Sequence, residues 1–316
     1  MANSDADKVT QLRELLPATS AGIYLDTATR GPIPAETAAA MREAEDWELR
    51  VGRVWDGRDE DVRQRHEEAR AVVAALISAD PDRITLAPSL ETAALIVGET
   101  RATKPEAIER FVHPWTGELR RVDPASYAVV DVSMAVGAIP VAVEDIGAEA
   151  VIFAADKWLL GPEGVTVAWT RGGTPRLPGL ALARTALIGF ARTVGWLEMY
   201  VGLEWMFDRT EALARRLHAS LSATDGADVL TPVDRAAAIV TFKLANWPAS
   251  AAVEELSRRV HALVRETPEG DAVRASVAWF NTEEELDRFA QGVAELAAHT
   301  PETLPRRPTL VMPGDA

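Results

Sequence analysis

Lysine is the rarer basic residue of this chain, and one lysine stands in a context that suits chemistry. The lysines are Lys8, Lys104, Lys157 and Lys243, and the other basic residues are arginines. Lys157 follows the apolar run AVIFAAD and precedes the turn-forming segment GPEG. A buried lysine can lose its proton and form a Schiff base, which an arginine cannot do. The alternative is a lysine whose stem packs at a strand end while its amine reaches water.

Asp131 is the second residue whose position needs an explanation, because it lies inside the apolar run YAVVDVSMAVG. An unpaired carboxylate in such a strand is costly, so we expect it to have a partner. One suitable partner is the protonated pyridine nitrogen of pyridoxal 5'-phosphate (PLP). The alternative is an aspartate that caps the turn after the strand.

Short apolar runs rich in β-branched residues predict the strands that position these side chains. The runs cover residues 84–87, 127–133, 150–155 and 165–170. They are nearly continuous rather than alternating, which is typical of a parallel sheet covered on both faces. Helical spacing of apolar residues predicts helices at 34–49 and at about 60–77. The predicted fold class is therefore α/β.

The second half of the chain predicts a smaller α+β lobe. A long amphipathic helix is expected over 194–221, with one apolar stripe formed by Trp196, Met199, Leu203 and Met206. After it we expect a strand at 238–244, a helix at 251–265, a strand at 273–280 and a final helix. Thr282 and Glu285 have the spacing of a capping box at the start of that final helix.

Composition excludes several classes of function. The chain has 316 residues and a formal net charge of −15, which disfavours nucleic acid as a partner. It has no cysteine, which excludes disulfides, thiolate metal ligands and a protein persulfide. The five histidines lack the spacing of a metal site, so no metal is expected. No apolar run is long enough to span a membrane and no leader sequence is evident, so we expect a cytoplasmic protein.

Five segments in order carry a resemblance to a known family. They are YLDTATRGPIP, ITLAPSLETAALIV, VVDVSMAVGAIPVAV, AVIFAADKWLLGPEGV and VRASVAWFNTEEELDRF. The sequence resembles class V aminotransferase-like, fold type I PLP-dependent enzymes, a group that includes cysteine desulfurases, isopenicillin N epimerase-like proteins and ergothioneine-pathway carbon-sulfur lyases. The resemblance implies a PLP-binding large domain over residues 20–200. It also implies a small α+β domain built from residues 1–19 and 201–316.

The resemblance also assigns roles to individual residues. Lys157 matches the lysine that forms a Schiff base with PLP, and Asp131 matches the aspartate that pairs with the pyridine nitrogen. Arg274 matches the arginine that binds the substrate α-carboxylate, although an arginine considered alone could equally form a surface ion pair. Ser89 and Leu90, at the start of a predicted helix, match the phosphate cradle.

Several positions depart from the family pattern. Leu90 stands where the family has a phosphate-binding threonine, Met134 where it has a glutamine, and Asp156 where it has a histidine. The segment ARTALIGFART also lacks an evident glycine-threonine pair, which a partner subunit normally offers to the phosphate. Each change removes a hydrogen bond or a cation from a dianionic phosphate, and Asp156 adds repulsion if it points inward.

The large domain is also shorter than the family pattern near residues 99–126. Only 40 positions separate Glu91 from Asp131, so the second, third and most of the fourth strand of the family sheet are expected to be missing. In the family sheet the strand order is 3-2-4-5-6-7-1, so loss of these strands leaves the order 5-6-7-1. The sheet then has a new edge, which the 99–126 loop or another chain must cover. His113 or Trp115 in that loop is a candidate to stack on the cofactor ring; the alternative is a turn with a packed aromatic side chain.

Two functions from different classes follow. The first is a PLP-dependent enzyme, a transferase or lyase, that acts on an amino acid as its small-molecule substrate, by transamination, racemisation or carbon-sulfur or β-elimination chemistry. The second is a degenerate relative with a structural or regulatory role, as partner of a full-length protein. The retained Lys157, Asp131 and Arg274 favour the first, whereas the weakened phosphate site favours the second. The resemblance further implies a homodimer.

Overall fold

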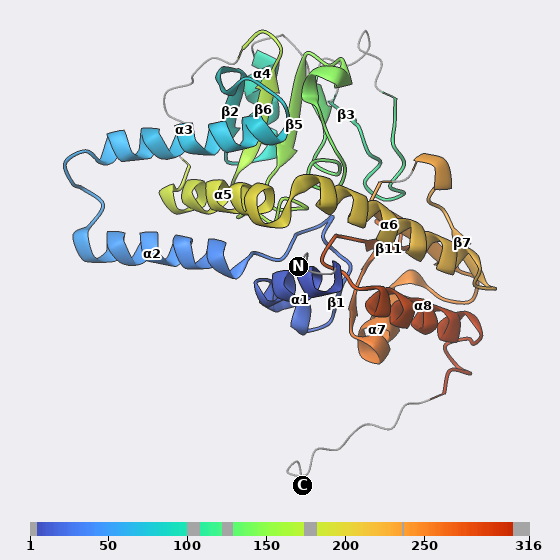
Figure 1. Ribbon diagram of the computed structural model, residues 1–316. Helices are drawn as coiled ribbons and strands as arrows, with labels where there is room; N and C mark the ends of the chain where they lie inside the picture. The colour runs from blue at the N-terminus through green and yellow to red at the C-terminus, as the bar shows by residue number, and fades with distance from the viewer. Residues whose placement is uncertain (1–4, 100–107, 122–128, 174–181, 236, 306–316) are drawn as a thin grey trace.

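The computed structural model describes residues 5–99, 108–121, 129–173, 182–235 and 237–305. Its central sheet has the strand order β2-β6-β5-β4-β3 (Figure 1). These strands are β2 Ile84–Ala87, β3 Ile108–Arg110, β4 Val129–Asp131, β5 Ala150–Ala154 and β6 Thr166–Thr170. Four of them run in one direction, and β6 is antiparallel to both of its neighbours. The prediction of a mainly parallel sheet is confirmed, and only β6 departs from it.

A segment of the 99–126 loop covers the edge of β4. β3 pairs with β4 in parallel, with Ile108 opposite Val129 and Arg110 opposite Asp131. Of the two alternatives that the sequence left open for this edge, the loop is therefore the one observed. The extent to which the large domain is shortened stays a prediction.

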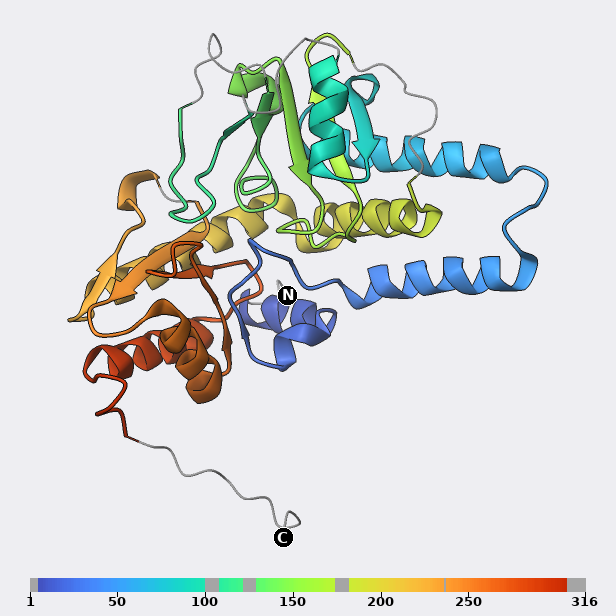
Figure 2. The same cartoon turned by 180° about the vertical axis from the view of Figure 1, so that it is seen from behind.

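Helices pack on both faces of the central sheet (Figures 1 and 2). Successive residues of β5 alternate between the two faces: Val151 and Phe153 belong to the larger core, whereas Ile152 packs with α4 (Leu90–Glu99). On the larger face, α2 (Ala35–Val51) and α3 (Arg58–Leu76) lie beside α5 (Arg184–Trp196), which contacts both. Both predicted helices in this region are confirmed.

The predicted long helix over 194–221 is interrupted. α5 ends at Trp196, a π-helical turn covers Leu197–Val201, and α6 covers Leu203–Ser222. Gly202, which joins them, has a φ of 82°, a value that glycine adopts without strain. The prediction of one apolar stripe is therefore wrong at Met199, which is 81% exposed, because the wider turn rotates it out of register.

The smaller lobe contains the sheet β10-β11-β8-β7. Its strands are β7 Ala227–Val229, β8 Ile239–Leu244, β10 Arg265–Glu266 and β11 Val273–Ser276. α6 and α8 (Glu283–Ala297) pack together beside it, and α8 starts with the predicted capping box of Thr282 and Glu285. α7 covers Ala249–Val260, so the prediction of a helix to 265 is wrong: His261 is left-handed, with a φ of 55°.

The N-terminal segment contributes to both lobes. Leu12 in α1 (Asp5–Glu14) and Leu16 belong to the core of the central sheet. Ile23 in β1 (Ile23–Tyr24) belongs to the core of the smaller lobe, where β1 pairs with β9 (Ala262–Leu263). Single 3₁₀ turns lie at Pro17–Ser20, Pro81–Arg83, Val143–Ile146 and Val233–Arg235. The domain boundaries at 19 and 200 stay a prediction.

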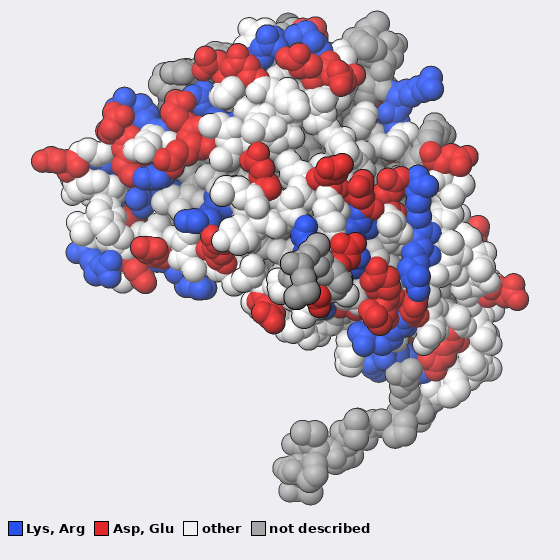
Figure 3. Space-filling view, viewed as in Figure 1, with Lys and Arg blue, Asp and Glu red and all other residues white. Residues whose placement is uncertain are grey.

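Acidic and basic side chains are interspersed on the face that Figure 3 shows. Many of the arginines form ion pairs, such as that of Arg216 with Asp287 at 2.7 Å. Within the described part of the chain, no helix combines the length and the apolar character that a membrane crossing requires. Nor do its His, Asp and Glu side chains gather in groups of three or more able to hold a metal ion.

Candidate active site

Lys157 lies just beyond the carboxyl end of β5, where its amine meets the backbone of another segment. Its Nζ donates hydrogen bonds to the carbonyl oxygens of Ala28 at 3.1 Å and Thr29 at 3.3 Å. Burial lowers the pKa of the Lys157 amine, and the negative charges of Asp156 and Asp131 oppose that shift. The Lys157 amine is therefore partly buried and hydrogen-bonded to backbone carbonyl oxygens, and its role as a Schiff-base lysine stays a prediction.

The segment 26–31 fits closely around Lys157. The backbone N–H of Gly31 donates to the carbonyl oxygen of Asp156 at 2.8 Å. A Cβ atom at Gly31 would collide with the carbonyl oxygen of Lys157 and with the side chain of Leu160. The approach of the two backbones therefore requires glycine at position 31.

Asp131 ends β4, the parallel neighbour of β5. Its Oδ1 accepts hydrogen bonds from the backbone N–H of Ser133 at 2.8 Å and from the Ser133 hydroxyl at 2.5 Å. The Ser133 hydroxyl in turn accepts from the N–H of Ala154 in β5. The turn-capping interpretation is therefore observed for Oδ1. Among the described residues, no donor forms a hydrogen bond with the other oxygen, Oδ2. Oδ2 is also not fully buried, so it can accept a hydrogen bond from another group.

Ser89 and Leu90 lie at the start of α4, as predicted. The Ser89 hydroxyl accepts from the N–H of Thr92 at 3.2 Å, which is the arrangement of an ordinary helix N-cap. Leu90 packs against the apolar cluster beneath α4. A hydrogen bond from Ser89 lowers the pKa of the exposed Glu91 carboxyl, so a negative charge already occupies this helix terminus.

Arg274 in β11 is enclosed by protein groups. Only 2% of it is exposed. Its Nη2 lies 2.8 Å from Asp26 Oδ1 and also donates to the Thr29 hydroxyl, while Nη1 donates to the Pro114 carbonyl oxygen at 3.2 Å. The interpretation as a surface ion pair is wrong, because this ion pair is buried.

The guanidinium of Arg274 is also covered by an aromatic ring. Its carbon lies 4.7 Å from the centre of the Trp115 ring, which is a cation–π contact. Burial lowers the pKa of Arg274, and the charge of Asp26 opposes that shift. Its Nε is buried and has no hydrogen-bond partner within the described residues. Two faces of this side chain are therefore already occupied by the protein.

The residues 111–120, which we call the strap, carry Trp115 from β3 to the smaller lobe. The Thr241 hydroxyl donates to the carbonyl oxygen of Trp115, and the N–H of Ala237 donates to that of Gly117 at 2.9 Å. In the same turn, His113 Nδ1 accepts from the N–H of Thr116 at 3.0 Å. The alternative of a turn with a packed aromatic is thus observed. Stacking of His113 on a cofactor stays a prediction.

Asp156 and Met134 are the other two residues that depart from the family pattern. Asp156 directly precedes Lys157, and Met134 lies at the core. Asp156 Oδ2 is 3.8 Å from Arg30 Nε, and its Oδ1 is buried without a hydrogen-bond partner in the described part of the chain. Met134 packs against the core of the central sheet. The charge of Asp156 opposes the lowering of the Lys157 pKa by burial, and its repulsion of a bound phosphate stays a prediction.

The structure therefore brings most of the predicted residues to one region. Asp131 ends β4, Lys157 follows the adjacent strand β5, and Arg274 is hydrogen-bonded to the 26–29 segment that accepts the Lys157 hydrogen bonds. β2, which leads to Ser89, runs in the same direction as β4 and β5, so these strands end at one edge of the sheet, where α/β proteins bind ligands. Sequence reasoning missed Asp26 and Thr29, although both lie in the quoted segment YLDTATRGPIP.

The strand order of the central sheet and the α+β lobe that follows α6 match the fold type I architecture of solved cysteine desulfurases. The fold class predicted from the sequence is confirmed. No family model matches the sequence. No curated protein matches it either.

Particular solved structures share this fold. The apo cysteine desulfurase from Thermococcus onnurineus NA1 matches with a TM-score of 0.77 and 18% identity, over 92% of this chain and 98% of that chain. The cysteine desulfurase CsdA from Escherichia coli matches with a TM-score of 0.74 and 18% identity, over 94% of this chain and 99% of that chain. The cystine C-S lyase C-DES, in complex with cysteine persulfide, matches with a TM-score of 0.69 and 15% identity, over 88% of this chain and 99% of that chain. At these identities the likeness shows the fold alone.

Proposed function

We propose that this protein binds PLP at Lys157 and acts on an amino acid. The observation that carries the proposal is the placement of a partly buried amine just beyond the end of β5 and of a carboxylate with one free oxygen at the end of its parallel neighbour β4. Burial also lowers the pKa of that amine. An amine that loses its proton readily is the nucleophile for an aldehyde. A fixed carboxylate is the group that keeps a pyridine nitrogen protonated.

The residues present fit the ring of PLP better than its phosphate. Asp131 Oδ2 can accept a pyridinium N–H because Ser133 occupies only Oδ1. At the α4 terminus, by contrast, the Ser89 hydroxyl already caps the helix, and Glu91 adds negative charge. We therefore expect PLP to bind through Lys157 and Asp131, with a weaker contribution from the phosphate.

When bound, PLP supplies an electron sink that stabilises negative charge at the substrate Cα. In the proposed reaction, Lys157 holds and moves a proton at that carbon, since its amine is basic and loses solvation in this region. Asp131 holds the proton on the ring nitrogen. Arg274 has the right chemistry for an α-carboxylate, but Asp26 pairs with its guanidinium and Trp115 of the strap covers it. Both contacts must loosen before a substrate carboxylate can bind there.

Within this proposal, transamination, racemisation and β- or carbon-sulfur elimination all remain open. Because the chain contains no cysteine, sulfur cannot be carried as a persulfide on a thiol of this chain. An elimination that releases sulfur directly needs no such thiol. Homodimer formation and a cytoplasmic location stay predictions from the resemblance and the sequence.

The proposal is tested by the visible absorption spectrum of the purified protein after incubation with excess PLP. We expect a yellow protein whose absorption band survives dialysis and is lost in Lys157→Ala. Lys243→Ala is the matched control, because Lys243 is an exposed lysine paired with Asp271. A wild-type protein that remains colourless and retains no PLP would contradict the proposal.

One observation favours the second candidate, a structural or regulatory relative without catalysis. Both Nη atoms of Arg274 are bound to protein partners, which is the state expected of a structural arginine. The two candidates differ in the same spectrum after amino acids are added. A PLP-loaded protein whose band shifts with no proteinogenic amino acid, in the wild type and in Trp115→Ala alike, would favour the second candidate.

A further inference from the structure

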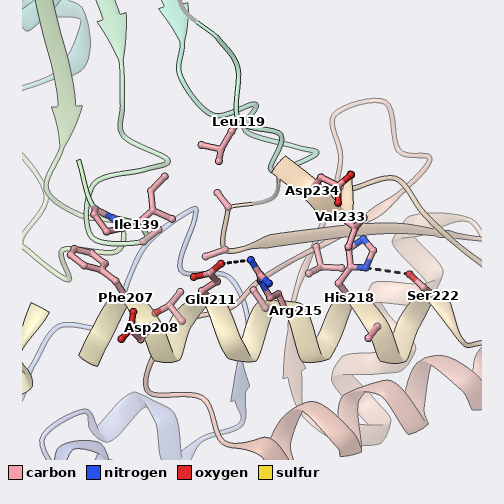
Figure 4. Close-up of a pocket in the computed structure, with 18 residues that line it drawn as sticks. Leu119, Ile139, Phe207, Asp208, Glu211, Arg215, His218, Ser222, Val233 and Asp234 are labelled. Carbon is pink, nitrogen blue, oxygen red and sulfur yellow. Dashed lines mark hydrogen bonds and ion pairs between the residues drawn. The ribbon is translucent and has the colours of Figure 1, made fainter. Parts of the chain in front are cut away.

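A cavity of about 930 Å³ lies along one side of α6 (Figure 4). Its walls are α6, the turn at 138–140, residues 233–234 and 237–240, and Leu119 of the strap. Lys157, Asp131 and Arg274 do not line it. Its volume falls in the range of small-molecule sites in proteins, which is about 300–1,000 Å³. It is therefore large enough for a ligand separate from the proposed PLP site.

The body of the cavity is apolar. Phe207 and Ala214 line it from α6, and Ala238 and Val240 line it from the region of β8. In Figure 4, Leu119 and Ile139 face the helix from the opposite side. A ligand that fills this space must bury an aliphatic chain or a ring, because such walls offer few hydrogen bonds.

The polar groups at the rim carry a negative surplus. The charged side chains that line the cavity are three carboxylates, Asp208, Glu211 and Asp234, and one guanidinium, Arg215. Their formal charge is therefore 1 − 3 = −2. Arg215 is already paired with Glu211 at 2.5 Å. Asp208 and Asp234 have no ion pair or hydrogen bond within the described residues, and Figure 4 places them toward opposite ends of the cavity.

The other polar side chains of the cavity are occupied within the protein. His218 Nε2 lies 2.8 Å from the carbonyl oxygen of Thr231, and its Nδ1 lies 3.3 Å from the Ser222 hydroxyl. The Thr210 hydroxyl donates to the carbonyl oxygen of Met206 at 2.7 Å. The unpaired groups are therefore carboxylates, and they select for positive charge.

We propose that this cavity binds a small organic cation, namely a primary amine attached to an aliphatic or aromatic body. The apolar walls hold the body, and Asp208 or Asp234 accepts hydrogen bonds from the ammonium group. The site is independent of the PLP site and does not require the proposed function to hold. An anion of the same shape is disfavoured, because it would lie beside the local negative charge.

The test compares three probes of similar shape: n-octylamine, n-octanol and octanoate. Binding is measured by isothermal titration, and it is located by methyl NMR shifts of Leu119 and Ile139, which lie across the cavity from α6. We expect n-octylamine to bind most tightly and octanoate least. The double variant Asp208→Asn, Asp234→Asn should weaken n-octylamine binding about three- to tenfold and leave n-octanol unchanged, since exposed ion pairs are worth about 0.2–1 kcal/mol each.

Two matched controls separate this site from the general attraction of an acidic protein for amines. Asp225→Asn with Asp228→Asn removes two exposed carboxylates that do not line the cavity, so it should leave binding unchanged. Ala219→Trp fills the cavity from an exposed position of α6 and should abolish binding, whereas Ala223→Trp, just beyond α6, should not. Equal binding of n-octylamine and octanoate, or no shift of Leu119 and Ile139 up to about 10 mM n-octylamine, would overturn the proposal.

Discussion

At the scale of single residues, the Lys157 amine is subject to two opposing influences. Burial favours its neutral form, whereas Asp156 and Asp131 favour its charged form, and burial prevails. Lys243 is the natural comparison within the same chain, because its ion pair with Asp271 raises its pKa. The two lysines therefore represent an amine prepared to lose its proton and an amine that retains it.

The difference between the two lysines predicts their titration. After reductive ¹³C-methylation of the PLP-free protein, we expect the NMR signal of Lys157 to titrate below the ordinary lysine pKa of 10.5 and that of Lys243 above it. Because the folded state lowers the pKa of Lys157, it binds fewer protons there than the unfolded chain does. The contribution of Lys157 to stability therefore rises as the pH increases toward 10.5. The reverse order of the two signals would contradict the structure.

The buried ion pair of Arg274 and Asp26 predicts a large effect on stability. Asp26→Ala leaves the guanidinium buried without its counter-charge, and we expect a loss of about 3–5 kcal/mol in the free energy of unfolding. The control is Asp271→Ala, which removes an exposed pair and should cost about 1 kcal/mol or less. Urea denaturation of the two variants and the wild type measures both losses. Equal losses would show that Arg274 is accessible to water.

At the scale of elements, the strap and the α5–α6 connection determine what the site can do. The strap reaches from the sheet edge to the smaller lobe and places Trp115 on Arg274. The π-helical turn at Leu197–Val201 and Gly202 let the chain change direction between α5 and α6. As a result, α6 turns one face toward the 138–140 turn, where the cavity lies.

Alanine substitutions at two glycines in or near this connection are predicted to change the stability in opposite directions. Gly202→Ala forces a side chain into a positive-φ conformation, so we expect a loss of about 1–2 kcal/mol in stability. Gly195→Ala lies in the interior of α5, where an added Cβ meets open space, and we expect a gain of about 0.5–1 kcal/mol. Thermal and urea denaturation provide the comparison. A stabilised Gly202→Ala protein would mean that the break between the helices is absent in solution.

At the scale of the whole molecule, features with a local cause could be predicted from the sequence. The β-branched run 84–87 became β2 at the predicted residues, and Thr282 with Glu285 formed the capping box. The end of α7 was not predicted, because no glycine or proline marks it and the left-handed residue that ends the helix is a histidine, a weaker signal. The enclosure of Arg274 was equally out of reach, since it depends on Asp26, Thr29 and Pro114, which lie 160 or more positions away in the chain.

The anchoring of the strap also has a mechanical consequence. Its carbonyl groups accept hydrogen bonds from Thr241 in β8, from Arg274 in β11 and from Ala237, which lies two residues before β8. A hinge motion that parts the two lobes must therefore break all of these bonds together. The Ala237 amide, whose hydrogen points at Gly117, then serves as a built-in reporter: its hydrogen–deuterium exchange rate measures how often the molecule opens.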